Sequence, residues 1–363
     1  MNLNKRQQAF QATNTLDAFL ITSLTNVRYL CGFTGSSGAL AVARQRWAFF
    51  TDGRYTEQAK AQVRNASVHI ASGAPALLAV KWIAERVGRR KPAQIGFEAD
   101  HLSFATEKRI ASELRSYLSR SGFRLVPTSN AVEGLRIKKD ASEIKLIGNA
   151  VQLASGIFSN AIHAIRPALN ENDIAAELEY LARRAGAEKM SFDSIVASGP
   201  NSARPHARPT LRKIGRGFVV LDYGVILGGY CSDMTRTVWV GRATGEARQI
   251  YSAVLEAQLA AIAAVTPGVE AQAADGAARN VLHKHKLDKY FTHSLGHGVG
   301  LEIHEAPRLA KGQTQKLKPG MVVTIEPGVY IPGKGGVRIE DMVLVTKTGC
   351  EVLTPTPKEF LVL

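Results

Sequence analysis

The chain has 363 residues, about two and a half times the ~150-residue size of a typical domain, so two domains are expected rather than one. Its 45% hydrophobic and 21% charged residues are typical of a globular protein and exclude a disordered or fibrous chain. The 46 basic and 31 acidic residues give a formal charge of +15. Because the basic residues form short clusters without interleaved aromatic residues, we expect solvated surface and no nucleic-acid partner.

No apolar run reaches the ~18 residues needed to span a bilayer, and the first residues carry no hydrophobic segment of a secretory signal. We therefore expect a cytoplasmic protein with no membrane partner. The three cysteines, Cys31, Cys231 and Cys350, lie far apart and form no C-x-x-C pair. This spacing argues against a disulfide scaffold or a zinc knuckle.

The first part of the chain alternates short apolar segments with amphipathic ones, which predicts a small α/β domain. The expected strands cover residues 18–21, 39–43, 47–50 and 68–71, and the expected helices cover 56–63, 77–87 and 105–118. The pattern lapses between Pro127 and Glu133. We therefore predict two domains, residues 1–130 and 131–363.

The second part repeats one plan. One helix begins at Glu143 and ends before Arg166-Pro167, and a second runs from the cap Asn170 to Arg184; a strand hairpin follows. The plan then recurs with a helix that begins at Glu246 and ends before Thr266-Pro267, a helix to about His285 and another hairpin. The two prolines are 100 residues apart. Two copies of an α-α-β-β unit are too few for a solenoid, so we expect two pseudo-symmetric halves that share one cleft.

Each predicted hairpin carries an acid at the end of its first strand and another in its returning strand: Asp222 with Asp233, and Glu326 with Glu340. Gathered together, the four carboxylates would repel one another by roughly 20 kcal/mol at an effective dielectric constant of 20. Arg236 and Arg338 are nearby cations, but two divalent metal ions would match the four charges, and His297 offers a nitrogen ligand. Any one of these residues alone would indicate a turn cap or an edge-strand charge, whereas the repetition favours a metal site.

At these residues the chain resembles the M24 metallopeptidase family of methionine aminopeptidase, aminopeptidase P, prolidase and creatinase, which has the pita-bread fold. Residues 135–350 resemble the catalytic domain. Residues 26–36 and 50–55 resemble the amino-terminal domain, which methionine aminopeptidase lacks. The resemblance implies an α/β (α+β) protein: a small amino-terminal α/β domain followed by a pseudo-symmetric pita-bread catalytic domain.

The resemblance also implies roles for individual residues. Asp222 would chelate one metal ion, His297 and Glu326 the other, and Asp233 and Glu340 would bridge both. Glu326 would also accept the proton of the attacking water. His206 would reach the substrate near the scissile bond, His304 would hydrogen-bond the developing oxyanion, and His293 would line the proline subsite.

The ligand types favour Mn(II), while Co(II), Zn(II) or Fe(II) would fit the same set. The amino-terminal domain and His293 favour cleavage of an Xaa-Pro bond in a proline-containing peptide. We expect an aminopeptidase P-like enzyme, with a prolidase as the alternative. Arg338 could bind the free carboxylate of a dipeptide, although it is also well placed to pair with a metal-binding acid. The family further implies a homodimer.

Two other functions remain open at this stage. Creatinase shares both domains but uses no metal, and the complete ligand set argues against it. A non-catalytic binding module on the same fold is the remote alternative, for which the charge of +15 is the only support.

Overall fold

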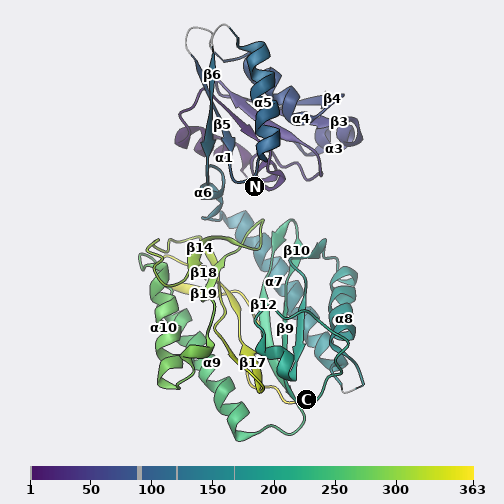
Figure 1. The fold of residues 1–363 in the computed structure, drawn as a ribbon, viewed down its shortest axis with the longest axis vertical. Helices are drawn as coiled ribbons and strands as arrows, with labels where there is room; N and C mark the ends of the chain where they lie inside the picture. The colour runs from purple at the N-terminus through teal and green to yellow at the C-terminus, as the bar shows by residue number, and fades with distance from the viewer. Residues whose placement is uncertain (1, 88–91, 120–121, 167) are drawn as a thin grey trace. The chain divides into compact units, whose positions relative to one another are not determined.

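The computed structural model describes residues 2–87, 92–119, 122–166 and 168–363 (Figure 1). Contacts divide the chain into two compact units, residues 1–136 and 137–363. Pro167, one of the two prolines that mark the sequence repeat, lies outside the described residues. No described helix is both long and apolar enough to cross a membrane.

The first unit is built on a mixed six-stranded sheet in the order β4-β3-β2-β1-β5-β6. Strand β1 pairs antiparallel with β2 and parallel with β5, and the strands at each edge of the sheet pair parallel with their neighbours. Apolar side chains of α4 and α5 pack on the sheet to form the core. The elements of this unit are α1 (Leu3–Thr13), β1 (Ala18–Ile21), α2 (Leu24–Cys31), β2 (Ala39–Ala43), β3 (Arg46–Asp52), α3 (Thr56–Gln62), β4 (Ser67–Ala71), α4 (Pro75–Ala84), β5 (Ala93–Glu98), α5 (Phe104–Tyr117), β6 (Phe123–Thr128) and α6 (Glu133–Arg136).

A buried polar cluster places the short helix α6 in the first unit. The fully buried Asn26 amide donates to Glu98 Oε1 at 2.7 Å and to Glu133 Oε1 at 2.5 Å. Its Oδ1 accepts from Arg136 Nη1 at 2.8 Å. Because these bonds hold α6 against α2, the units divide at Arg136, six residues beyond the boundary predicted from the sequence.

The second unit contains two helix pairs, each followed by strands. The chain passes through α7 (Ala141–Ala161), α8 (Glu171–Arg184), β7 (Lys189–Met190), β8 (Ile195–Ser198), β9 (Gly217–Tyr223), β10 (Val225–Leu227), β11 (Tyr230–Cys231) and β12 (Met234–Val240). It continues through α9 (Gly245–Ala264), α10 (Ala271–Lys284), β13 (Gly296–Gly298), β14 (Glu305–Leu309), β15 (Val322–Ile325), β16 (Gly328–Ile331), β17 (Gly335–Arg338), β18 (Asp341–Val345) and β19 (Cys350–Val352).

The two halves of this unit have equivalent layouts. In the first half β12 and β8 pair antiparallel with β9, and in the second half β18 and β13 pair antiparallel with β15. Figure 1 shows α7 and α8 on one side of the strands and α9 and α10 on the other. Each half has its own apolar core, with Leu178 and Leu221 in one and Val254 and Val323 in the other. The duplicated architecture inferred from the sequence is therefore present.

The returning strand of each repeat is more interrupted than the sequence indicates. A small hairpin of β10 and β11 precedes β12, and a hairpin of β16 and β17 precedes β18. Glu340 lies between β17 and β18, where its backbone N–H donates to Thr235 O at 3.1 Å in the other half. At Glu340 the chain passes from the β16–β17 hairpin to β18, which pairs with β15. A single continuous returning strand therefore cannot form.

Arg236 joins the two halves at this crossing. Its guanidinium donates to Glu340 O at 2.6 Å and to Asp341 Oδ1 at 2.7 Å. Two further bonds reach the backbone oxygens of Thr356 and Pro357 at 2.6 and 2.9 Å. Since Arg236 is only 2% exposed, its charge is neutralised inside the protein by Asp341, and the segment that contains Glu340 is tied to β12, which follows Asp233.

Candidate metal centre

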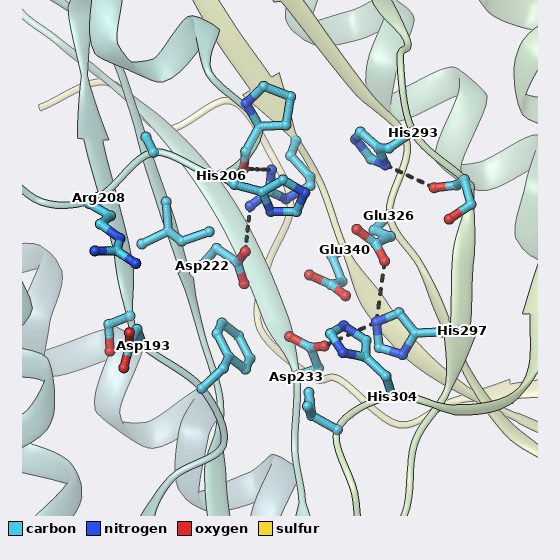
Figure 2. Close-up of a pocket in the computed structure, with 18 of the residues that line it drawn as sticks. Asp193, His206, Arg208, Asp222, Asp233, His293, His297, His304, Glu326 and Glu340 are labelled. Atoms are coloured by element: carbon cyan, nitrogen blue, oxygen red, sulfur yellow. Dashed lines mark hydrogen bonds and ion pairs between the residues drawn. The ribbon is translucent and has the colours of Figure 1, made fainter. Parts of the chain in front are cut away.

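The paired strands bring the carboxylates of both repeats into one cavity of about 670 Å³. Asp222 is the penultimate residue of β9 and Asp233 immediately precedes β12, while Glu326 immediately follows β15 and Glu340 immediately precedes β18. Figure 2 shows that the four acids come from opposite sides and point toward one another. All nine site residues named in the sequence analysis line this cavity, including His206, His293, His297, His304 and Arg338.

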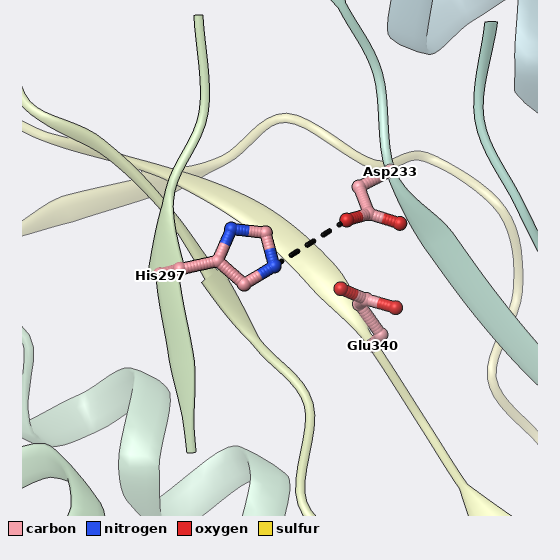
Figure 3. Close-up of side chains that lie close together, drawn as sticks. All are labelled: Asp233, His297 and Glu340. Carbon is pink, nitrogen blue, oxygen red and sulfur yellow. Dashed lines mark ion pairs between the residues drawn. The ribbon is translucent and has the colours of Figure 1, made fainter. Parts of the chain in front are cut away.

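Three of the expected ligands form a compact group. One ligand atom from each of Asp233, His297 and Glu340 lies within 4.8 Å of the other two (Figure 3). His297 Nε2 is 3.7 Å from Asp233 Oδ2 and 3.5 Å from Glu326 Oε1. Glu326 and Asp222 line the same cavity beside this group. The five residues are thus gathered as a ligand set requires.

The hydrogen bonds of His297 leave a lone pair facing the acids. Its Nδ1 lies 3.0 Å from Gly298 O, which can only accept, so Nδ1 carries the proton and Nε2 carries none. Burial lowers the pKa of His297 to about 4, so the imidazole is neutral near pH 7. An unprotonated nitrogen beside two carboxylates is the arrangement that a bound cation stabilises.

The acids themselves have few protein donors. Glu340 accepts from Thr235 Oγ1 at 2.6 Å, and Glu326 accepts from Thr324 Oγ1 at 3.2 Å. Asp222 Oδ1 is buried and has no hydrogen-bond partner among the residues that the structure describes, while its Oδ2 accepts from Arg338. Burial raises the pKa of Glu326 to about 8. Burial, and then the charge of neighbouring acids, raises the pKa of Asp233 and Glu340 as well. These groups are therefore poorly solvated and fit divalent ions.

Glycines allow the backbone to approach His297 closely. A Cβ atom on Gly296 would lie 2.0 Å from Thr324 O, and one on Gly298 would lie 2.3 Å from Ala306 O. Any side chain at these two positions would push β13 away from its neighbours β15 and β14. The glycines on both sides of His297 therefore hold it close to the acids.

A chain of hydrogen bonds that the sequence did not indicate joins the cavity residues Arg338 and His293. Arg338 Nη1 donates to the Tyr330 hydroxyl at 2.6 Å, and this hydroxyl lies 2.9 Å from His293 Nε2. His293 Nδ1 lies 2.8 Å from Ser294 O, so Nδ1 donates and Nε2 accepts. Tyr330 follows Glu326 by four residues in a short apolar strand, and no motif distinguished it from a core residue.

The remaining two histidines lie on different sides of the acids. His304 packs edge-on against His297, with ring centroids 4.4 Å apart. His206 lies beside Asp222, on the opposite side from His297 and His304 (Figure 2). Burial lowers the pKa of His304, which favours its neutral, hydrogen-bonding form. Four further charged residues line the cavity and were not singled out from the sequence: Asp193, Arg208, Glu305 and Arg308.

Comparisons with known proteins agree with this architecture. The model of Metallopeptidase family M24 matches residues 145–347, and that of the Creatinase/Prolidase N-terminal domain matches residues 3–138. The Xaa-Pro dipeptidase of Pyrococcus horikoshii is 36% identical over 97% of this chain and 96% of its own. The solved structure of an Xaa-Pro dipeptidase from Bacillus anthracis has a TM-score of 0.93 at 40% identity and covers 100% of both chains. That of an X-Pro aminopeptidase from Thermotoga maritima has a TM-score of 0.88 at 34% identity, covering 98% of this chain and 100% of its own.

The family model covers more than half of the chain, and the full-length relatives share both of its units. The chain therefore belongs to metallopeptidase family M24, as a peptide-bond hydrolase that carries the creatinase/prolidase amino-terminal domain.

Proposed function

We propose that the protein is an Xaa-Pro dipeptidase. The relatives named above include a Pyrococcus and a Bacillus protein that are called Xaa-Pro dipeptidases. The sequence favours an aminopeptidase, whereas these relatives favour the alternative, a dipeptidase. The Thermotoga neighbour, named an X-Pro aminopeptidase, is also similar, so substrate length is the property to test.

The five gathered ligands support a pair of divalent metal ions. Asp222, Asp233, His297, Glu326 and Glu340 would hold them, and the unpartnered Asp222 Oδ1 is the observation that carries this assignment. Two such ions supply Lewis acidity and a water of lowered pKa. The oxygen-rich ligand set favours Mn(II) over thiolate-preferring ions, with Co(II), Zn(II) and Fe(II) as alternatives.

Glu326 and two histidines near the ligands can transfer the proton, hydrogen-bond the carbonyl oxygen and orient the substrate. Glu326 is placed to accept the proton of the attacking water and to pass it toward the leaving proline nitrogen. His304 is kept neutral and packs on His297, so its ring N–H can donate to the oxygen of the scissile carbonyl. His206 approaches the same space from the side of Asp222 and can orient the substrate.

His293 supplies a wall for the proline ring, and the Tyr330 hydroxyl holds the imidazole in place. Burial lowers the pKa of His293 to about 4, and both of its ring nitrogens are engaged by Ser294 O and the Tyr330 hydroxyl. The imidazole therefore has no free donor or acceptor to offer. This suits the Xaa-Pro bond, which is a tertiary amide without an N–H, because the ring must be recognised by shape.

Arg308 is the best-placed cation for the free carboxylate of a dipeptide. Arg338, which was considered for this role, donates to Asp222, Tyr330, Thr235 Oγ1 and Pro205 O. Arg308 lines the cavity, is exposed and lies opposite His297 in the pairing of β13 with β14. Among the described residues the Arg308 guanidinium has no hydrogen bond or ion pair, so it can bind a carboxylate with two hydrogen bonds.

Substrate length can be tested with Leu-Pro, Leu-Pro amide and Leu-Pro-Gly, each assayed with Mn(II), Co(II), Zn(II) and Fe(II). We expect kcat/KM for Leu-Pro to exceed that for the two blocked peptides by at least about tenfold, because only Leu-Pro carries the carboxylate on its proline. Leu-Ala serves as the control for proline recognition. Cleavage of Leu-Pro-Gly without cleavage of Leu-Pro would instead identify an aminopeptidase.

The homodimer implied by the family resemblance stays a prediction. Size-exclusion chromatography with light scattering would test it, with a mass of twice 39.2 kDa expected.

A further inference from the structure

Two charged side chains on one wall of the cavity have no role in the mechanism above. Asp193 lies in the segment between β7 and β8, and Arg208 lies in the segment that leads into β9. Both line the cavity and are exposed. Within the part of the chain that the structure describes, neither side chain has a hydrogen bond or an ion pair. They are therefore free to bind groups that enter the cavity.

The backbone on both sides of this wall is fixed. Ser194, next to Asp193, is 4% exposed and begins the approach to β8. Thr210, two residues after Arg208, donates from its N–H at 3.1 Å and from its hydroxyl at 2.7 Å to the buried Glu171. The two charges thus project from anchored segments rather than from loose loops, which keeps their positions relative to the cavity defined.

The position of the pair indicates which part of a substrate it meets. Figure 2 shows Asp193 and Arg208 on one side of the metal-site carboxylates and His293 on the other. If the proline ring packs on His293, as the proposed function requires, the preceding residue extends toward Asp193 and Arg208. Apolar cavity residues are available to contact the stem of that side chain, namely Phe192, Ile195 and Ile303.

We propose that Arg208 and Asp193 set the charge preference for the residue before proline: Arg208 binds an acidic side chain, and Asp193 binds a basic one. This inference rests on the proposed Xaa-Pro dipeptidase activity. The free carboxylate of the dipeptide is assigned to Arg308 in the other half of the unit, so Arg208 remains for a second anionic group.

The test measures kcat/KM for Glu-Pro, Leu-Pro and Lys-Pro with the metal-loaded protein, and expresses the charged substrates as ratios to Leu-Pro. Arg208→Gln should lower the Glu-Pro ratio by about three- to tenfold, the effect of one partly solvated charge pair. Asp193→Asn should lower the Lys-Pro ratio by a similar factor. Arg208→Glu should lower the Glu-Pro ratio further and raise the Lys-Pro ratio, and 0.5 M salt should weaken all of these differences.

Matched controls separate a local effect from a change in total charge. Arg212→Gln removes a positive charge from the same segment, and Glu179→Gln removes a negative charge from α8. Both residues are exposed and neither lines the cavity, so neither ratio should change. Arg208→Lys keeps the charge and should retain most of the Glu-Pro preference.

The outcomes distinguish this inference from the function on which it depends. Cleavage of Leu-Pro with ratios that move no more in the Arg208 and Asp193 variants than in the controls would overturn the charge preference and leave the dipeptidase intact. Failure of the metal-loaded protein to cleave any of the three dipeptides would overturn both.

Discussion

The second unit buries carboxylates in two very different ways. Glu171 is fully buried and accepts hydrogen bonds from the N–H and hydroxyl of Ser198, from Asn201 Nδ2, and from the N–H and hydroxyl of Thr210, at 2.6 to 3.1 Å. Glu340 and Asp222 are nearly as buried, yet within the described residues Glu340 accepts only from Thr235, and one oxygen of Asp222 has no partner.

This difference separates a structural acid from a ligand. A carboxylate that receives four or five protein hydrogen bonds is already solvated by the protein and stabilises the loop that surrounds it. A group of buried carboxylates with few donors raises the free energy of the folded protein unless a cation joins it. The number of protein hydrogen bonds to a buried carboxylate therefore distinguishes a structural acid from a candidate metal ligand better than its burial or residue type does.

The largest effect is expected from Asp233→Asn. Loss of a ligand should lower kcat/KM by at least about 1000-fold, and metal content measured by mass spectrometry should fall. Because the substitution also removes a repelling charge, the metal-free variant should unfold at the same temperature as the metal-free wild type or at a higher one. A metal-free variant that unfolds earlier would show that Asp233 is a structural acid like Glu171.

His206→Ala tests whether lining the cavity is enough to make a residue a ligand. No hydrogen bond or ion pair involves the His206 side chain in the described part of the chain, and we assign it to the substrate. Turnover should fall by roughly 10- to 100-fold while metal content stays unchanged. Loss of metal equal to that in Asp233→Asn would mean that His206 belongs to the ligand set.

Glu171→Gln should give the opposite result to Asp233→Asn. The amide can accept fewer of the five hydrogen bonds, so the free energy of unfolding should fall by roughly 1 to 3 kcal/mol. Metal content should be retained, and chemical denaturation with and without Mn(II) measures both quantities. Metal loss without loss of stability would remove the distinction drawn here.

The pH dependence of the metal-free protein sharpens the comparison further. Burial raises the pKa of Glu326 to about 8, far above its value in the unfolded chain. The folded state therefore holds a proton that the unfolded state has released, and its stability is lost as pH rises from about 4.5 toward 8, by roughly 1.4 kcal/mol per pH unit for each such proton.

Metal binding must displace these protons, so apparent affinity for Mn(II) should increase with pH over the same range. Denaturation of the chelated protein between pH 5 and pH 8, and calorimetric titration with Mn(II) in buffers of different ionisation enthalpy, measure the two effects. A flat stability profile would show that the acids are solvated better than their contacts indicate.

The sequence was sufficient for those parts of the fold that have a local signal. The helix pairs were predictable from caps such as Asn170 and from apolar spacing, and the gathering of the four acids from their repetition at strand ends. The structure brings the expected ligands together because the hairpins that carry them are equivalent in the two halves.

Features that depend on distant residues could not be predicted in this way. The first unit ends after Arg136 because Arg136 binds Asn26, 110 residues earlier. Arg338 donates hydrogen bonds to Asp222 and Tyr330, which lie 116 and 8 positions away in the sequence, and these bonds occupy donors that a substrate would otherwise need. No local pattern encodes which donors a buried guanidinium finds, since tertiary packing decides it.

The bonds of Arg236 across the two halves have a consequence for how the centre is assembled. One half contributes Asp222 and Asp233, and the other contributes His297, Glu326 and Glu340, so neither half alone offers the complete set of proposed ligands. The complete set exists only after the strands of Asp233 and Glu340 have met through Arg236. Metal binding would therefore require that the two copies of the repeat have docked correctly, and a chain in which they have not docked would lack the complete site.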